Sequence, residues 1–296
     1  MKTIRKRFVS IFIFIFLFFP LVSQSKTDYV KIPFELKDGY ILLPVNFSKS
    51  AQFQLVLDTT GDYSMLTQKG IENLSDKIGE DIYAWLRRQI KNKEPQLSEQ
   101  ALELRLQSVS SGEISLINMR NLWIGSVQFT NEVFFDEHNS HLPGDGCVGI
   151  KIFNKNYVKN MVIDYKNKTF ELNAQLHKGN GVPMHRINSD SVYGYYILAE
   201  LDGEEQPFIL ATGTSIIVVQ GNKKESGKKK ESTRYEAEIR VGENVQKYAV
   251  MKNNDSSIRA DDFTRSVFPN YNILGLPFFK DKCVQFDFEN MMLYVW

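Results

Sequence analysis

The sequence predicts a mainly β protein built from two halves with one shared order of elements. Apolar residues alternate with polar ones in short runs bounded by glycine, asparagine and aspartate, a pattern typical of half-buried strands. The order of strand, turn, apolar strand and Thr/Gly corner then occurs a second time along the chain, which indicates an internal repeat.

Residues 1–25 are expected to be a secretory signal peptide. Four basic residues precede an apolar run over residues 8–22, and small residues follow at the spacing of a cleavage site. An uncleaved membrane anchor is the alternative, although the run is shorter than the roughly 20 residues that span a bilayer comfortably. We therefore expect an exported protein, periplasmic or secreted, with no membrane association after the signal peptide is removed.

The first half is expected over residues 26–175. In QFQLVLDTTG, Phe53, Leu55 and Leu57 alternate with other side chains, which predicts a strand with one strongly apolar face. Over residues 70–92, apolar side chains instead recur every three or four positions, which is the spacing of a helix. This half should therefore contain a helical insertion.

The second half, expected over residues 176–296, repeats the pattern without that helix. The run PFILATGTS is an apolar strand that ends in a Thr/Gly corner, like QFQLVLDTTG in the first half. An apolar-apolar-Gly element follows later in both halves, as CVGI and as ILGL, and each half closes with a hairpin in which Asp precedes the turn. The halves should meet near residues 173–183, where Gly, Asn and Pro cluster.

The charge balance argues against a nucleic-acid partner. The chain has 36 Lys and Arg against 35 Asp and Glu, and four of the basic residues lie in the expected signal peptide. The remaining chain is slightly acidic, so it has no overall positive field for a polyanion. The basic cluster over residues 223–231 is expected to be a solvated hairpin tip, with contact to an anionic surface as the alternative.

Neither a disulfide scaffold nor a metal centre is expected. Cys147 and Cys283 are the only cysteines, and each lies in an apolar strand-like run where a buried free thiol is typical. A single long-range disulfide is the alternative, because export would permit it. His138 and His141 have acidic neighbours and suggest a weak metal site, but a polar loop explains them equally well. We expect no metal and no cofactor.

Two β-rich halves with these elements resemble the aspartic proteases, specifically the retropepsin-like branch in its two-lobed, single-chain form. The resemblance depends on LVLDTTGDYS and CVGI in the first half and on FILATGTS and ILGLPFF in the second. It covers most of the chain after residue 25. It implies a mainly β fold of two β-barrel lobes, residues 26–175 and 176–296, with the helical insertion in the first lobe.

The resemblance also implies roles for particular residues. In this family each lobe presents one Asp at a strand-to-loop corner, and the two carboxylates share a proton and activate a water molecule. The next residue bonds across to the opposite lobe. On this pattern Asp58 is the catalytic acid of the first lobe, and Thr59 and Thr212 are the cross-lobe hydroxyls. Gly149 and Gly275 would support the two corners.

The chain departs from the family pattern at both corners. Thr60 stands where the pattern has glycine, and Gly61 is displaced by one residue. Ala211 stands at the position of the second Asp, although Gly213 is kept. Without a like-charged neighbour, Asp58 loses the force that raises one pKa of the pair, so we expect it to stay ionised and to lack a matched acid.

The preferred hypothesis is an exported, monomeric protein that binds an extended peptide or protein segment in a cleft between its lobes and cleaves it poorly or not at all. Asp58 is the catalytic candidate. The candidate binding residues are Thr59, Gly61, Ala211, Thr212 and Gly213. Residues 106–116 are a candidate flap over the cleft, with an ordinary surface hairpin as the equal alternative.

The alternative is an active aspartic endopeptidase. It requires either two chains that bring two Asp58 side chains together or a substitute acid, for which Asp62, Asp145 and Asp202 are candidates. Asp145 lies between two glycines and Asp202 precedes a glycine, so both are expected to be solvated turn residues. A purely structural role is a third hypothesis.

Overall fold

The computed structural model shows a mainly β chain, as the sequence predicts. It describes residues 29–48, 51–61, 63–79, 84, 87–88, 91–92, 95–102, 116–137, 142–155, 158–187, 194–220, 233–253 and 271–296. Across these ranges, no helix combines the length and the apolar character needed to cross a bilayer. The expected signal peptide and the basic cluster over residues 223–231 lie outside them.

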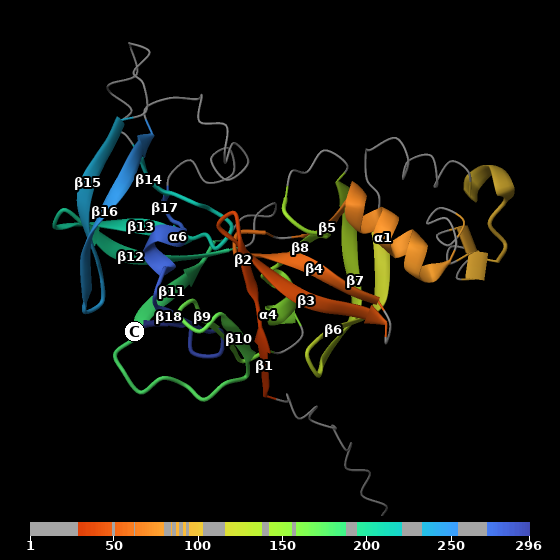
Figure 1. Ribbon diagram of the computed structural model, residues 1–296, viewed down its shortest axis with the longest axis horizontal. Helices are drawn as coiled ribbons and strands as arrows, with labels where there is room; N and C mark the ends of the chain where they lie inside the picture. Colours follow the sequence, from red (N-terminus) through yellow and green to blue (C-terminus); the bar gives the residue numbers. More distant parts are fainter. Residues whose placement is uncertain are drawn as a thin grey trace, which may run out of the picture.

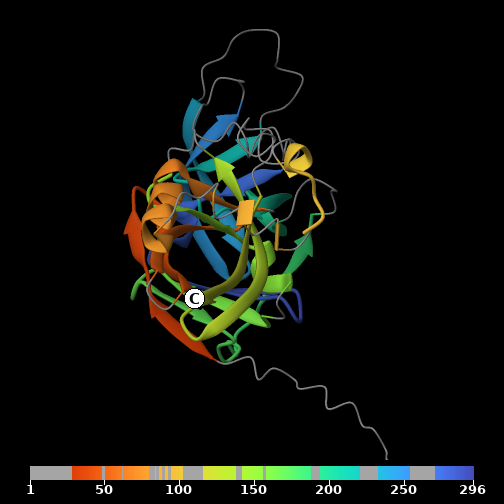
Figure 2. The same cartoon turned by 90° about the vertical axis from the view of Figure 1, so that its right-hand side faces the viewer.

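Six strands of the first half form a closed barrel, on the right in Figure 1. They are β3 (Tyr40–Ser48), β4 (Ala51–Asp58), β5 (Ser64–Thr67), β6 (Leu116–Ile124), β7 (Val127–Glu137) and β8 (Gly146–Gly149). Their order is β3-β4-β8-β5-β7-β6, and pairing of β6 with β3 closes the ring. The short strand β2 (Glu35–Lys37) adds to β3. Figure 2 looks at this barrel from its outer side and shows its strands curving around a common axis.

Six strands of the second half form a second barrel of the same topology. They are β12 (Tyr195–Leu201), β13 (Glu204–Leu210), β14 (Ile217–Gln220), β15 (Thr233–Val241), β16 (Asn244–Asn253) and β17 (Asn272–Leu274). Their order is β12-β13-β17-β14-β16-β15, closed by pairing of β15 with β12. Strand directions also match, because β4 with β8 and β5 with β7 are parallel, as are β13 with β17 and β14 with β16. The internal repeat predicted from sequence is therefore confirmed in the topology.

A joint sheet connects the two barrels, below and between them in Figure 1. Its strands, in spatial order, are β1 (Val30–Pro33), β10 (Thr169–Leu172), β9 (Asn160–Asp164), β18 (Cys283–Asp287), β19 (Met292–Val295) and β11 (Val182–Arg186). At its centre β9 and β18 pair antiparallel, so the hairpins β9–β10 and β18–β19 are related by an approximate two-fold axis.

The turns of these two hairpins use the same local contact. Asp164 accepts hydrogen bonds from the backbone and side-chain nitrogens of Asn167 at 2.9 and 2.7 Å. Asp287 accepts the equivalent bonds from Asn290 at 3.0 and 2.8 Å. The Asp that the sequence places before each turn therefore stabilises that turn through its own side chain.

The helical insertion is present between β5 and β6 as α1 (Gln68–Ile78). Thr67 caps its first turn by accepting a bond from Gly70 N at 3.2 Å, and Gly79 ends it with φ of 70°. The predicted helix continued to residue 92, and beyond Gly79 only part of that stretch is described. Two short helices, α4 (Lys151–Lys155) and α6 (Leu276–Phe279), follow β8 and β17 at equivalent places in the repeat.

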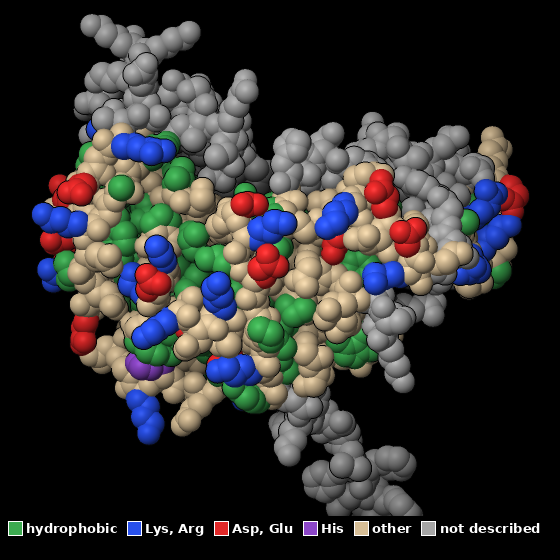
Figure 3. Space-filling model, in the orientation of Figure 1, with side chains coloured by type: hydrophobic (Ala, Val, Ile, Leu, Met, Phe, Trp, Pro, Cys, Tyr) green, Lys and Arg blue, Asp and Glu red, His purple; other side chains and the backbone are tan. Residues whose placement is uncertain are grey.

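One large apolar core extends through both barrels and the joint sheet. It includes the predicted alternating face of β4, where Phe53, Leu55 and Leu57 are at most 1 % exposed. Phe208 of β13 is equally buried in the same cluster. Burial of each such side chain contributes about 1.5–3 kcal/mol. On the face shown in Figure 3, the described basic and acidic side chains are interspersed.

Both cysteines are free thiols, as predicted. Cys147 lies in β8 of the first barrel and is buried, whereas Cys283 is partly exposed in β18 of the joint sheet. The alternative prediction, a long-range disulfide between Cys147 and Cys283, is therefore wrong.

Candidate functional site

The two Thr/Gly corners lie at equivalent points of the two barrels. The first corner, residues 58–61, begins where β4 ends at Asp58, opposite Gly149 of β8. The second corner, residues 211–214, begins one residue after the end of β13, whose last residue is opposite Leu274 of β17. Each corner therefore follows a strand that is paired with a parallel neighbour.

Gly149 and Gly275 support the corners by close backbone approach, as the resemblance implied. A Cβ on Gly149 would lie 2.6 Å from the carbonyl oxygen of Gly61. A Cβ on Gly275 would lie 2.5 Å from the carbonyl oxygen of Thr214, which is the equivalent residue of the second corner. No other residue type fits at either place without displacement of the backbone.

Thr59 and Thr212 join the two barrels through reciprocal hydrogen bonds, which we call the threonine interlock. Thr212 N donates to Thr59 Oγ1 at 2.9 Å, and Thr59 N donates to Thr212 Oγ1 at 3.3 Å. Thr59 Oγ1 donates to Leu210 O at 2.6 Å, and Thr212 Oγ1 donates to Leu57 O at 2.8 Å. Each hydroxyl therefore bonds to the opposite barrel, as the resemblance implied, and in this buried place each both donates and accepts.

Thr60 holds the carboxylate of Asp58. Asp58 Oδ1 accepts from Thr60 N at 2.8 Å and from Thr60 Oγ1 at 2.7 Å, and the backbone N–H of Gly61 also bonds to this carboxylate. A Cβ on Gly61 would lie 2.7 Å from Asp58 Oδ2, so glycine at this position leaves room for the carboxylate. Sequence reasoning missed this role, although an Asp followed two residues later by Thr is a known local hydrogen-bonding pattern.

Burial raises the pKa of Asp58, and the hydrogen bonds from Thr60 and Gly61 oppose that rise because they favour the charged form. The raised pKa does not test the expectation that Asp58 stays ionised, because only its direction is established. A like-charged neighbour is one source of a raised pKa, and desolvation at this corner is another. Among the described residues, no second carboxylate contributes to the shift.

Ala211 supplies no chemistry to the second corner. It is 1 % exposed, and its methyl group belongs to a small apolar cluster with Val218 and Ile273 of its own barrel. Gly213 is partly exposed, and a Cβ there would lie 3.8 Å from the ring of Tyr40 in the first barrel. Tyr40 thus lies beside the second corner, a neighbour that the sequence did not predict.

Burial divides the predicted site residues into two groups. Asp58 and Gly213 are partly exposed and can be reached from solvent. The other candidates are buried inside the corners and are not open to solvent: Thr59, Gly61, Ala211 and Thr212.

None of the described substitute acids stands beside Asp58. We expected Asp145 to be a solvated turn residue, and this prediction is wrong. Asp145 is 5 % exposed and accepts hydrogen bonds from Gln54 N at 2.9 Å and Asn73 Nδ2 at 2.6 Å. Asp145 therefore connects β4 to α1. The sequence did not indicate this role, because the two flanking glycines are typical of a turn. Asp202 is an exposed turn residue as predicted, with φ of 50°. Asp62 lies outside the described residues.

Two further predictions also fall outside the described part of the chain. They are the possible metal site at His138 and His141 and all but the last residue of the candidate flap over residues 106–116. Where the chain is described, no three His, Cys, Asp or Glu side chains gather in a way that would hold a metal ion.

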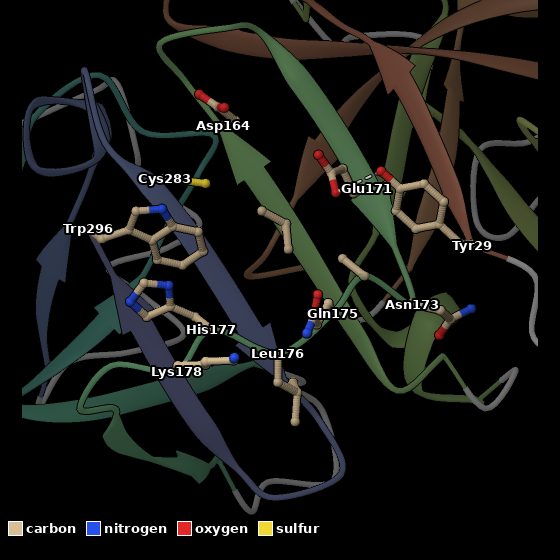
Figure 4. A pocket seen from close by; sticks show the side chains of 12 residues that line it. Tyr29, Asp164, Glu171, Asn173, Gln175, Leu176, His177, Lys178, Cys283 and Trp296 are labelled. Atoms are coloured by element: carbon tan, nitrogen blue, oxygen red, sulfur yellow. Dashed lines mark hydrogen bonds between the residues drawn. The ribbon is translucent and has the colours of Figure 1, made fainter.

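An open pocket of about 910 Å³ lies on the outer face of the joint sheet (Figure 4). No residue of either corner lines it. Glu171 in this pocket pairs with Lys31 at 2.8 Å and accepts a bond from Tyr29, and the ring of His177 stacks on Trp296 at 4.1 Å. Burial raises the pKa of Cys283 to about 12, so this thiol stays protonated at neutral pH.

Comparison with known proteins adds no assignment. No family model matches the chain, and no curated protein matches it.

Proposed function

We propose that this protein is a two-lobed, retropepsin-like member of the aspartic-protease type that binds an extended peptide or protein segment and cleaves it poorly or not at all. The observation behind the proposal is the threonine interlock between equivalent corners, only one of which has a carboxylate. In this proposal the two barrels are the lobes, and the ligand lies across the corners. Export is proposed from the apolar run over residues 8–22.

Hydrolysis of a peptide bond needs two proton transfers at the site. Asp58 can accept a proton from a water molecule, but Ala211 offers no acid to protonate the substrate carbonyl. A positioned general acid or base contributes about 10²–10⁴ in rate. Loss of the second carboxylate should therefore reduce cleavage to a slow background reaction.

Binding of an extended peptide does not need that second carboxylate. Such binding uses backbone hydrogen bonds and side-chain pockets, and the corners only have to be held in place. The threonine interlock and the glycine contacts hold both corners without any charged group. The proposed binding function is therefore independent of the lost catalytic function.

A cleavage series tests the proposal. A peptide mixture is incubated from acidic to neutral pH with the unmodified chain, Asp58→Asn and Ala211→Asp, and fragments are measured by mass spectrometry. Ala211→Asn is the matched control, because it adds similar volume at this buried position without an acid. We expect no cleavage by the unmodified chain or by Asp58→Asn, and a gain of cleavage only in Ala211→Asp. Efficient cleavage by the unmodified chain that disappears in Asp58→Asn would instead favour an active endopeptidase.

A further inference from the structure

The Asp58 carboxylate has no cationic partner among the described residues. Its hydrogen bonds come from the neutral groups of Thr60 and Gly61, and no Lys, Arg or His contributes to its pKa. Lys151 follows the corner-supporting strand, but its ammonium lies over the ring of Tyr63, 5.6 Å from the ring centre. A partly buried carboxylate without a counter-charge is unfavourable, so a ligand that brings a positive charge would relieve it.

The carboxylate also keeps room for a ligand. A carboxylate has about four acceptor sites. Thr60 fills two of these sites, both on Oδ1, and the Gly61 backbone further favours the charged form. Asp58 is partly exposed, so solvent reaches this side chain. Thr60 fixes the orientation of the group by donating twice to Oδ1, which leaves the acceptor capacity on the side of Oδ2.

We propose that Asp58 is the anionic subsite for a cationic group of the bound peptide, with Thr60 as its positioning residue. This inference rests on the proposed peptide-binding function and names the chemistry of its ligand. A lysine or arginine side chain or a free terminal amine would donate a charge-assisted hydrogen bond to the carboxylate. The second corner, with Ala211 and Gly213, is uncharged, so the preference for a cation arises from the first corner alone.

The raised pKa of Asp58 supports the same conclusion. Burial disfavours the ionised carboxyl in the free protein, and a bound cation would lower that pKa again by stabilising the charged form. In an active protease the second carboxylate would compete with such a ligand for this position by sharing a proton with the first. The substitution by Ala211 removes that competitor.

Affinity selection tests the inference. The full chain is immobilised and exposed to a random library of short peptides with blocked termini, in which norleucine replaces lysine in half of the members. Retained peptides are counted by mass spectrometry. We expect about tenfold enrichment of lysine and arginine over norleucine, because a hydrogen bond to a charged group is worth about that factor or more. A second library with free amino termini shows whether a terminal amine serves equally well.

Three variants separate charge recognition from simple damage. Asp58→Asn should retain peptides but lose the preference for cations. Thr60→Val keeps the carboxylate and loses its hydroxyl donor, so it should weaken the preference. Thr60→Ser restores the donor and should restore the preference. A structural defect alone would reduce retention of all peptides without changing their ratio.

The outcomes distinguish this inference from the function on which it rests. A cation preference that persists in Asp58→Asn overturns the subsite. Retention of peptides by the unmodified chain without any cation preference also overturns it, while peptide binding stands. Failure of the unmodified chain to retain any peptide overturns the proposed function and the subsite together.

Discussion

The hydroxyl groups of Thr59 and Thr212 stabilise the molecule where the two corners hydrogen-bond to each other. Each hydroxyl is buried and satisfies one backbone N–H and one backbone carbonyl of the opposite barrel. Asp58, by contrast, is fixed from within its own corner. The residues that hold the barrels together are therefore separate from the partly exposed carboxylate.

Replacement of Thr212 tests the interlock. Thr212→Val keeps the shape and removes the hydroxyl, which leaves Thr59 N and Leu57 O without this partner. We expect the free energy of unfolding to fall by about 1–3 kcal/mol for each buried group left unsatisfied. Thr212→Ser keeps the hydroxyl and is the matched control. Urea denaturation measures both, and equal stability of the two variants would show that the interlock is unimportant.

Asp58→Asn should change how stability depends on pH. The folded-state pKa of Asp58 is raised, so its contribution to stability is fully present below the unfolded-state pKa and is lost as pH rises through the folded-state pKa. Asparagine has no such loss. We therefore expect Asp58→Asn to become more stable relative to the unmodified chain as pH rises from acidic to neutral. A stability difference that is constant over this range would contradict the raised pKa.

Elements with strong local patterns could be predicted from the sequence, and those that depend on distant partners could not. Alternation predicted β4, and the helical spacing of apolar residues over residues 70–92 predicted the helix that begins as α1. The pairing of β9 with β18 at the centre of the joint sheet left no local pattern, because the two strands come from different halves. Asp145 was misjudged for the same reason, since its partners Gln54 and Asn73 are distant in sequence.

The candidate site at the two corners could be predicted from the sequence about as well as the fold. The positions of Asp58, Thr59 and Thr212 followed from the corners and their order in the chain. The hydrogen bond from Thr60 to Asp58 was not predicted, because the family pattern has glycine at that position. The desolvation of Asp58 could not be predicted either, because it depends on the packing of the whole corner.

Helix α1 packs so closely on the first barrel that Gly70 should not tolerate a side chain. A Cβ there would lie 1.8 Å from the carbonyl oxygen of Asp145, which is backbone and cannot turn aside. We expect Gly70→Ala to destabilise the protein by about 1–3 kcal/mol or more through overpacking. Gly79→Ala is the control at the other end of α1, where a Cβ meets nothing within 4 Å and only the φ of 70° is unfavourable. Thermal unfolding should show the larger loss for Gly70→Ala, and the reverse order would contradict this packing.

At the scale of the whole molecule, one apolar core joins the two barrels and the joint sheet. The pairing of β9 with β18 and the threonine interlock add two direct connections between the halves. Domains that share a core are expected to unfold together, because exposure of one half uncovers apolar surface of the other.

Hydrogen exchange tests this cooperativity. Phe208→Ala in β13 opens a cavity in the second barrel and should cost about 3–5 kcal/mol. If the core is shared, the most protected amides of β4 in the first barrel should lose protection together with those of β13. Loss confined to β12–β17 would show that the barrels unfold independently.

We propose that the two corners form a site that binds a peptide and cleaves it poorly or not at all. The most direct measurement is equilibrium binding of a peptide mixture to the full, unmodified chain, followed by recovery of the bound peptides and determination of their masses. We expect saturable binding and recovery of intact peptides after prolonged incubation at acidic and neutral pH. Recovery of fragments, or the absence of any bound peptide, would contradict it.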